Sequence, residues 1–371
     1  MIHSRWRRVL WLALALSGAG AASLPADAPA GVVPDRFAMS LGAGDKVNLR
    51  FVLQEPASVR ITAHDADHAP VCTVLADSPR PAGENAVTFD GRASDGSQLP
   101  RGVYYFVLRA ESRSGVMEHD PGALSGGESV PVEFGEYGYN RAARRLEFRL
   151  AKDAAVRVRA GIHGGPLLAT PLDWQPTAAG PHSIPWDGKD EDGLVDLAAH
   201  PKFSLVFQAF ALPAGSVTIT DGPQPQPTTA KASELLQRRA ALRKAALARG
   251  RIDPQYLSRA GYRTSPRFTL TSSSAKGEAG PLEATGAVPL TVKLDESSLQ
   301  RMLEQRFEIV TFVDFQRVAE EEQGYSPYTV EVPMAGLSEG EHVVSVSVVT
   351  LTDQSATKSI RVNVKLPARA P

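Results

Sequence analysis

Four aspartates crowd one short stretch of the sequence: Asp187, Asp190, Asp192 and Asp196. Carboxylate oxygens are the hard ligands that Ca²⁺ prefers, so calcium is the metal that this loop would bind. The spacing is not that of an EF-hand, in which acids alternate before a glycine and a distant glutamate. A structural interpretation competes with calcium, because Asp-Gly pairs also build tight turns. The sequence leaves both interpretations open.

A second charged set is basic and falls in a predicted helix from about residue 232 to residue 249. Its members are Arg238, Arg239, Arg243, Lys244 and Arg249, and Glu234 is the only acid in the span. Such a stripe suits an anionic glycan, a lipid headgroup or an acidic partner. The alternative is that the helix docks on a neighbouring domain.

The common catalytic motifs are missing from this sequence. It has no H-E-x-x-H, no P-loop, no G-x-G-x-x-G opening a helix and no G-x-S-x-G. His64 and His68 are four residues apart, but that spacing brings side chains together only on a helix, and this segment is typical of strand and turn. Cys72 stands alone in an apolar run, which indicates a buried thiol and excludes an internal disulfide. We therefore expect a protein that is not an enzyme and holds no cofactor other than the calcium considered above.

The N-terminus has the features of an export signal. Arg5, Arg7 and Arg8 precede a short apolar run at residues 9–16, and small residues follow. An uncleaved membrane anchor is the alternative. No second long apolar run exists, so we expect no transmembrane segment in the mature chain. The net charge of −1 over 371 residues gives no argument for nucleic acid. These features predict a periplasmic, secreted or cell-surface protein, most simply of a Gram-negative bacterium.

An internal repeat organises the first two thirds of the chain. Val59, Phe89 and Asp95 have counterparts at Val156, Trp186 and Asp192, and each pair is separated by 97 residues. A constant spacing across three motifs indicates one duplicated module of the size of a small β-sandwich. We expect Val59 and Val156 to be buried at equivalent positions, and likewise Phe89 and Trp186.

The pattern within the repeat is that of strands with one buried face. In the second copy Val156 and Val158 alternate with Arg157 and Arg159, which places the two arginines on the solvent-exposed face. Long arginine stems can cover apolar surface there while the charge stays in water.

The repeat resembles the immunoglobulin-like (Ig-like) modules of FlgD-type, flagellar hook-capping proteins. The residues that carry the resemblance in the first copy are Val59-Arg60-Ile61, Phe89-Asp90-Gly91, Asp95-Gly96 and Gly102-Val103-Tyr104. The second copy keeps Trp186-Asp187-Gly188 and Asp192-Gly193 but has Ala199-His200-Pro201 in place of the last motif. The resemblance implies an Ig-like fold and does not carry over the flagellar role, because a hook cap is not exported by a cleavable signal.

The remainder of the chain is predicted to be a third sandwich. Val313-Asp314, Pro327-Tyr328, Leu337, Gly340 and His342 resemble a pattern shared by bacterial Ig-like domains. Glu320, Glu321 and Glu322 are expected to form a solvated acidic loop. The predicted organisation is a signal peptide at 1–28, FlgD-type modules at 38–114 and 141–220 with a linker at 115–140, a proline-rich linker with the basic helix at 221–262, and the third Ig-like domain at 263–367.

The expected fold is therefore mainly β, with tandem Ig-like β-sandwiches and one basic linker helix. The leading functional hypothesis is an exported, non-catalytic binding or structural protein of the cell envelope, whose partner is an envelope protein or an anionic polymer. A second hypothesis is glycan binding, with Tyr137, Tyr139 and Trp174 as an aromatic platform. The third is an enzyme of unrecognised type, which a cleft with clustered carboxylates would favour.

Overall fold

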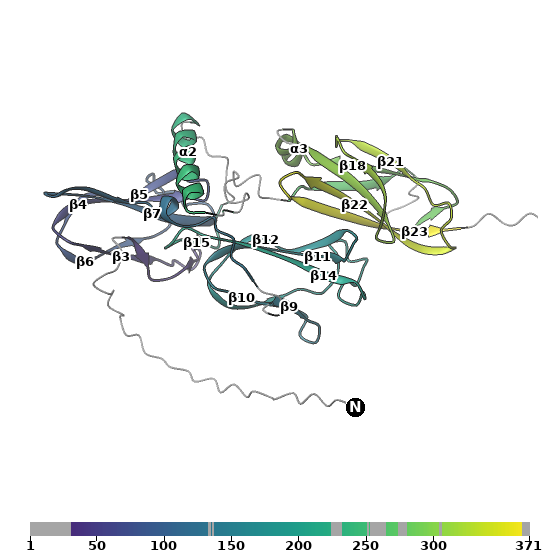
Figure 1. The fold of residues 1–371 in the computed structure, drawn as a ribbon, viewed down its shortest axis with the longest axis horizontal. Helices are drawn as coiled ribbons and strands as arrows, with labels where there is room; N and C mark the ends of the chain where they lie inside the picture. Colours follow the sequence, from purple (N-terminus) through teal and green to yellow (C-terminus); the bar gives the residue numbers. More distant parts are fainter. Residues whose placement is uncertain are drawn as a thin grey trace, which may run out of the picture.

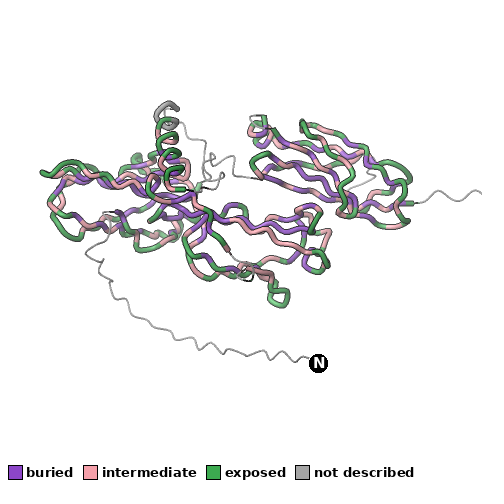
Figure 2. Tube along the Cα trace, viewed as in Figure 1, coloured by how far each residue is buried: buried purple, intermediate pink, exposed green. Residues whose placement is uncertain are grey.

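A computed structural model describes residues 31–132, 135, 137–223, 232–250, 252, 265–273, 280–303 and 306–365. Three β-sandwich modules follow one another along the long axis, and helix α2 (Ala232–Ala248) stands on the first of them (Figure 1). Buried residues follow the strands in each module (Figure 2), so every module has its own core. The predicted signal peptide lies outside the described residues.

The first module packs a three-stranded sheet, β1-β3-β6, against a larger sheet of order β2-β15-β7-β4-β5. Alternating side chains of β3 and β4 point into the core between them. The strands that belong to this part of the chain are β1 (Val33–Pro34), β2 (Ala38–Met39), β3 (Val47–Leu53), β4 (Ala57–Asp65), β5 (Pro70–Arg80), β6 (Gly83–Phe89), β7 (Gly102–Ser112) and β8 (Gly115–His119).

The second module repeats this arrangement with the sheets β13-β10-β9 and β12-β11-β14. The closing strand, which lacks the Gly-Val-Tyr motif, forms from Phe203 onward. The strands of the module are β9 (Tyr137–Asn140), β10 (Arg145–Leu150), β11 (Ala154–Ile162), β12 (Leu167–Thr177), β13 (Gly180–Pro185) and β14 (Phe203–Ala211).

The duplication extends to irregularities of the backbone. In the first module the pairing of β4 with β5 shifts between Val59↔Ser78 and Ile61↔Leu75. In the second module β11 and β12 shift between Val156↔Gln175 and Val158↔Leu172, which are the same positions 97 residues later. The extra residue has a positive φ in both modules, 27° at Asp77 and 49° at Trp174. A shared bulge of this kind is a designed feature of a fold, so the two modules are copies of one structure.

Val59 and Val156 are both fully buried, as expected from the repeat. Phe89 is 2% exposed, but Trp186 is only partly buried at the edge of its core. The expectation of equal burial is thus correct for the valines and wrong for Trp186, because one side of the second module is less completely covered.

The first module is completed by a strand from much later in the chain. β15 (Val217–Ile219) pairs antiparallel with β7 at Gly102–Tyr104 and parallel with β2. β8 pairs with the other half of β7, so two distant segments together form one edge of the sheet. Val217 and Ile219 are 0% and 1% exposed and belong to the core of the first module. Residues 217–219, which the sequence assigned to the second module, therefore lie in the first.

Asp221 fixes this return of the chain. Its carboxylate accepts hydrogen bonds from the Ser40 hydroxyl at 2.8 Å and from the backbone N–H groups of Leu41 at 2.6 Å and Gly42 at 2.9 Å. These donors lower the pKa of the Asp221 carboxyl, with the N–H of Gly42 contributing most. The predicted proline-rich linker therefore begins with a residue that closes the first module, and residues 224–231 of that linker lie outside the described residues.

The segment 115–140, predicted as a linker, carries strands of both flanking modules. β8 extends the sheet of the first module, and β9 extends that of the second. Between them lies the short helix α1 (Pro121–Leu124), which Asp120 caps by accepting a hydrogen bond from the N–H of Gly122. The two modules are therefore joined by shared structure rather than by a free spacer.

The predicted basic helix is confirmed as α2, and Gly250 follows it with a φ of 118°. Leu242 and Ala246 of the predicted apolar seam are buried, and the side chain of Leu235 lies outside the described residues. No helix among the described residues is long and apolar enough to cross a membrane.

The third module packs β16-β18-β21 against β17-β23-β22-β19-β20. The predicted acidic loop is corrected here, because Glu320 and Glu321 lie in the edge strand β20 and pair with β19. Charged side chains on an edge strand discourage pairing with other chains. The elements are β16 (Phe268–Ser272), β17 (Leu282–Ala284), β18 (Val288–Leu294), α3 (Glu296–Met302), β19 (Phe307–Val313), β20 (Gln316–Glu321), β21 (Tyr328–Val332), β22 (Gly340–Thr350) and β23 (Ser355–Val364).

The shared strand predicts that a residue outside the first repeat stabilises it. Ile219→Ala should lower the free energy of unfolding of the first module by about 2–4 kcal/mol, because the substitution opens a cavity in its core. Val116→Ala on β8, where the side chain is 62% exposed, is the control and should change it by less than about 0.5 kcal/mol. Denaturant titration measures both values. Equal effects of the two substitutions would show that β15 does not belong to this core.

Candidate functional site: the interface of the second and third modules

Two arginines of β11 are buried beneath the third module. Arg157 is 0% exposed and Arg159 is 5% exposed, so their predicted place on a solvent-exposed face is wrong. They do point away from the core of their own module, but the third module covers that face. Arg157 also stacks on Trp174, with its guanidinium carbon 4.6 Å from the ring centroid.

A single turn of the third module supplies the counter-charge. Asp353 lies between β22 and β23 with a φ of 65°, and its carboxylate accepts from Arg157 at 2.6 Å and from both terminal nitrogens of Arg159 at 2.9 Å. Its backbone carbonyl accepts a further bond from Arg157 at 2.6 Å. Gln208 of β14 accepts from both arginines and donates to the Asp353 carboxylate at 3.2 Å.

Burial and the pairing of opposite charges have opposing effects on the pKa values of the residues in this cluster. Burial and the neighbouring charge of Arg159 lower the pKa of Arg157 to about 10, while Asp353 acts to raise it. Burial alone would raise the pKa of Asp353, but the hydrogen bond and charge of Arg159 and the charge of Arg157 bring it below its ordinary value. Since buried charges are costly unless they are paired, each module here depends on the other.

A second group of contacts extends the interface along β23. The Thr357 hydroxyl donates to the carbonyl oxygen of Leu167 at 2.6 Å. Asp192 accepts from the Lys358 ammonium at 2.8 Å and from the N–H of Ser359 at 2.7 Å. Arg361 donates to the carbonyl oxygen of Leu194 at 2.8 Å. The Asp-Gly turn of the second repeat is thus a docking element for the third module.

The remaining aspartates of the predicted calcium loop organise the loop itself. Each accepts a backbone N–H a few residues ahead: Asp187 from Lys189, Asp190 from Val195 and Asp196 from Ala199. Burial raises the pKa of Asp190. Across the described residues, no group of three or more His, Cys, Asp or Glu side chains could hold a metal ion. Calcium binding by this loop therefore stays a prediction, without an assembled set of ligands. A metal site at His64 and His68 likewise has no assembled set of ligands among the described residues.

The basic helix is held to the first module by its arginines. Arg238 donates to the carbonyl oxygen of His68 at 2.9 Å, to the hydroxyl of Tyr105 at 3.0 Å and to the carboxylate of Asp120 at 3.0 Å. Its side chain is only 24% exposed. This residue therefore fastens α2 to the end of the first module.

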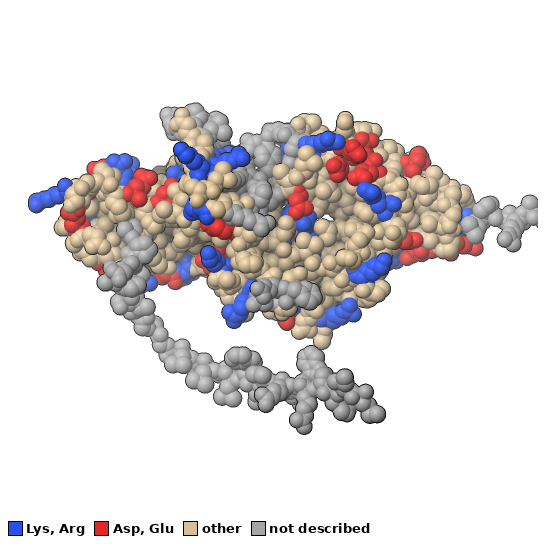
Figure 3. All heavy atoms as spheres, viewed as in Figure 1, with Lys and Arg blue, Asp and Glu red and all other residues tan. Residues whose placement is uncertain are grey.

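Two further arginines of the helix are used in the same way. Arg239 pairs with Asp67 at 3.3 Å, and Arg249 pairs with Glu128 at 3.4 Å and donates to the carbonyl oxygen of Gly126 at 2.9 Å. Basic side chains gather around the base of α2 (Figure 3), and the exposed members of the predicted set are Arg243 and Lys244. Binding of an anionic partner by the helix stays a prediction, and it now rests on these two residues.

The predicted aromatic platform does not form. Trp174 is buried in the cluster with Phe210, whereas Tyr137 and Tyr139 pack at the edge of another cluster. Cys72 is buried in β5 as predicted, and burial raises the pKa of its thiol to about 11.

A histidine of the third module has the partners of a catalytic triad but not its chemistry. His342 contacts the Asp314 carboxylate through Nδ1 at 2.6 Å, and its Nε2 lies 2.9 Å from the carbonyl oxygen of Ser338 and 3.5 Å from the hydroxyl of the same residue. The hydrogen bond to Asp314, followed by that to Ser338, raises the pKa of His342. Because Nε2 lies closer to the carbonyl oxygen than to the hydroxyl, it is placed to donate to the backbone rather than to accept the proton of the serine.

Sequence reasoning missed the residues that complete the interface. Arg157, Asp192 and Asp353 are all visible as charges, but nothing local indicates that Asp353, nearly 200 residues from Arg157, lies against it. Gln208 has no distinguishing motif either. The one available signal is the pair of arginines on alternate residues of a strand that itself contains no acid.

Residues 37–114 match the family model of the FlgD Ig-like domain. Among solved structures, FlgD from P. aeruginosa is 20% identical, with 33% of this chain and 84% of that chain covered at a TM-score of 0.20. The fibronectin(III)-like modules of Clostridium thermocellum CbhA are 10% identical, with 92% and 97% covered and a TM-score of 0.21. A tetra-tandem repeat from the extending region of a large adhesion protein is 14% identical, with 91% and 74% covered at 0.21. No curated protein matches the chain.

The family match stands on its own: the first module is an Ig-like domain of FlgD type, and the second repeats its strand pattern. The matched range ends before β15, so it does not include the strand that completes the sheet of the first module.

The interface predicts a large effect from one half-exposed carboxylate. Asp353→Ala should weaken docking of the third module by roughly 2–3 kcal/mol, because it leaves two buried arginines without a counter-ion. This value is lower than is usual for breaking a fully buried ion pair, because the Asp353 side chain is itself 48% exposed. Calorimetry should show the third module unfolding earlier and separately. Glu339→Ala, which removes an exposed acid from the same module, is the control, and an equal effect of both variants would contradict the assignment.

The Asp314–His342 pair predicts a pH dependence of the third module. Because the folded pKa of His342 is raised, its stabilisation is complete below the unfolded pKa of about 6.5 and is lost as the pH rises through the folded pKa. His342→Gln should remove this decline in melting temperature above neutral pH, whereas His163→Gln at an exposed position should retain it. Melting curves from pH 5 to pH 9 test it, and an unchanged slope in His342→Gln would contradict the role of this pair.

Proposed function

We propose that this protein is an exported, non-catalytic component of the bacterial cell envelope. Its three Ig-like modules act as one rigid spacer that presents binding surfaces at fixed positions. The observation that carries the proposal is the cluster of Arg157, Arg159, Gln208 and Asp353, which joins the second module to the third through buried charges. A set of freely jointed modules would have no use for two buried arginines.

The junction of the first two modules supports the same role. β15 closes the first module after the chain has passed through the second, and α2 is fastened by Arg238 and Arg249 to α1 and the segment that follows it. Two chain crossings between the same pair of modules restrict rotation more than one linker does. Many charged residues of the chain therefore form contacts that hold its modules together.

The envelope location rests on the sequence of residues 1–28 and on the FlgD-type module. Partners of such a protein would meet its sheet edges and loop ends, and the exposed Arg243 and Lys244 suit an anionic polymer. Glycan binding is less well supported, since Trp174 is buried and cannot join Tyr137 and Tyr139 in a platform. Catalysis is also less well supported, since Nε2 of His342 lies closer to the carbonyl oxygen of Ser338 than to its hydroxyl.

Export is tested by expressing the full chain in a Gram-negative host and fractionating the cells. We expect the mature protein in the periplasmic or secreted fraction, with an N-terminus between Ala22 and Pro29. The matched control replaces Arg5, Arg7 and Arg8 with Glu, which should leave the chain in the cytoplasm by disrupting the positive n-region. Recovery of the wild-type chain in the cytoplasm with Arg5 retained would contradict the proposal.

A further inference from the structure

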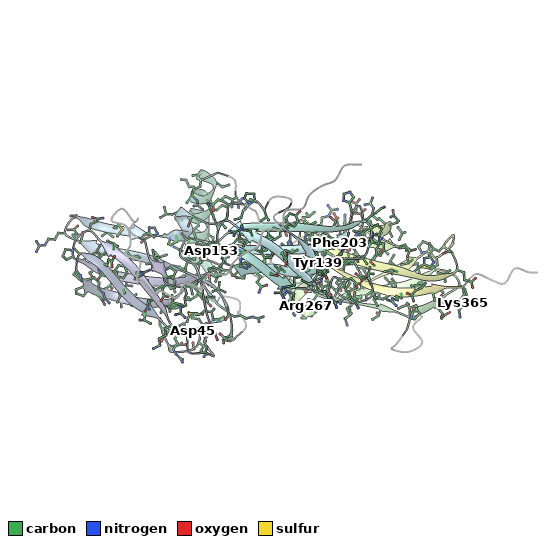
Figure 4. All side chains as sticks on the ribbon, turned by 90° about the horizontal axis from the view of Figure 1, so that it is seen from below. Asp45, Tyr139, Asp153, Phe203, Arg267 and Lys365 are labelled. Atoms are coloured by element: carbon green, nitrogen blue, oxygen red, sulfur yellow. The ribbon has the colours of Figure 1, made fainter. Side chains whose placement is uncertain are left out.

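The second module has an aromatic seam along one side, between β9 and β14. It consists of Tyr137, Tyr139, Trp186, Phe203 and Phe207, and each of these residues is only partly buried. The ring centroids of Tyr139 and Trp186 are 5.1 Å apart, and Phe203 lies 6.1 Å from each of them. Tyr139 and Phe203 lie together in the side-chain view (Figure 4). Five large rings are thus incompletely covered on one side of a single module.

The same side of the first module is closed. Val59 faces Ala110 on β7 and Val156 faces Ala209 on β14, so Tyr104, Phe106 and Leu108 correspond to Phe203, Leu205 and Phe207. The three residues of the first module are 3%, 1% and 1% exposed, whereas the three of the second are all partly exposed. The two copies therefore differ in what covers the last strand, and not in the strand itself.

The cover in the first module is an added strand. β15 lies against the edge of β7, next to β2, and inserts Val217 and Ile219 into the core. Met39 of β2 completes the cover at 1% exposed. β15 thus covers the start of β7, and β8 pairs with the strand from Leu108 onward.

In the second module, β14 is left at the edge of its sheet. The segment 127–130 bonds only to its final part, through the pairs Gly127–Ala211, Ala211–Glu128 and Val130–Ala209. Within the described residues, β11 is the only strand that pairs with β14 between Phe203 and Gln208, so the other edge of β14 has no partner strand there. Every second residue of an edge strand presents its N–H and C=O outward, ready to pair with another strand.

We propose that an extended polypeptide segment of a partner protein, with alternating apolar side chains, adds antiparallel to β14 and covers the aromatic seam. It would add to β14 in the way that β15 adds to β7, but farther along the strand, because β15 pairs with Gly102–Tyr104 and these positions correspond to residues 201–203. Its apolar side chains would pack on Phe203, Leu205 and Phe207. Strand addition of this kind gains affinity from backbone hydrogen bonds and specificity from alternate side-chain pockets. The inference rests on the proposed role of the protein as a binding spacer and names one of its surfaces.

A peptide suits this site better than a sugar. The rings of Trp186 and Phe203 are 26° from parallel, but the Tyr139 ring meets both of them edge to face, at 67° and 68°, so the three rings do not form one flat stacking surface. The N–H and C=O groups on the free edge of β14, beside the seam, need hydrogen-bond partners in register. An added strand provides such partners. The first module of the same chain contains such an added strand, because β15 pairs with β7 there.

The probe is a synthetic peptide with the sequence of residues 214–222, which contains β15. It is added to the full mature chain while amide hydrogen exchange of β14 is followed by residue. The expected result is saturable slowing of exchange at outward amides between Ser204 and Gln208, by about tenfold or more at saturation. A peptide with Val217 and Ile219 replaced by Ser should bind at least about tenfold more weakly, since it lacks the anchoring side chains.

Two variants of the chain locate the effect. Leu205→Glu places a charge in the seam and should abolish the slowing. Gln175→Glu makes the same change of charge on the exposed opposite edge of the sheet and should bind like the wild type. If Leu205→Glu lowers the melting temperature, Phe203→Ala serves as a milder variant, with weakened binding expected.

Three outcomes would overturn the proposal. Slow exchange in the absence of peptide would show that the edge is already paired within the chain. Slowing that appears when the protein alone is concentrated would assign the edge to a second copy. No response to the peptide, with a response to cellohexaose instead, would make the seam a sugar site. None of these results depends on the rigidity of the spacer, so the two proposals fail separately.

Discussion

Two buried guanidinium groups set the architecture of this protein. Arg157 and Arg159 project from the same face of β11, two residues apart, where their charges repel each other and neither is exposed to water. Such a pair is unfavourable unless an anion meets it, and the Asp353 turn of the third module is that anion. Removing the third module would expose both charges and the face of the sheet that they occupy. The position of the third module follows from this requirement.

The first module shows how the same scaffold avoids the requirement. The positions of Arg157 and Trp174 are held there by Arg60 and Asp77, which form an ion pair within the module. Gln208 corresponds to Arg109, which pairs with Glu111 at 2.6 Å on its own strand. The face is thus neutralised internally and stays exposed. The two faces therefore differ at the bulge, where Asp77 corresponds to Trp174, and on the last strand, where Arg109 corresponds to Gln208.

Most of the fold could be predicted from the sequence, because it is encoded in local patterns. Alternating valines, Asp-Gly turns and the constant spacing of the repeat are short-range features, and the FlgD-type resemblance rests on them. The exchange of β15 into the first module could not be predicted. Val217 and Ile219 have the alternating apolar pattern of a strand, and no local motif assigns that strand to the first module rather than the second. Only the three-dimensional path of the chain determines which of the two modules β15 completes.

The candidate site was less predictable, for a related reason. The charges of Asp192, Arg238 and Arg157 were recognised, but their roles depend on residues that lie 100 to 200 positions away in the sequence. Asp192, one of the candidate calcium ligands, forms an ion pair with Lys358, and Arg238, one of the candidates for binding an anionic partner, forms an ion pair with Asp120. A charge pattern shows that a group needs a partner, and tertiary structure determines which partner it has.

The central claim is that buried charges hold the second and third modules in one fixed arrangement. Pulsed electron spin resonance tests it with spin labels at Lys152→Cys and Glu339→Cys, both exposed, in a Cys72→Ser background. We predict one narrow distance distribution that is the same at about 0.15 M and about 1 M salt, since buried ion pairs are weakly screened. The same labels in Asp353→Ala should give a broad distribution. A broad or salt-dependent distribution in the otherwise unchanged chain would contradict the account.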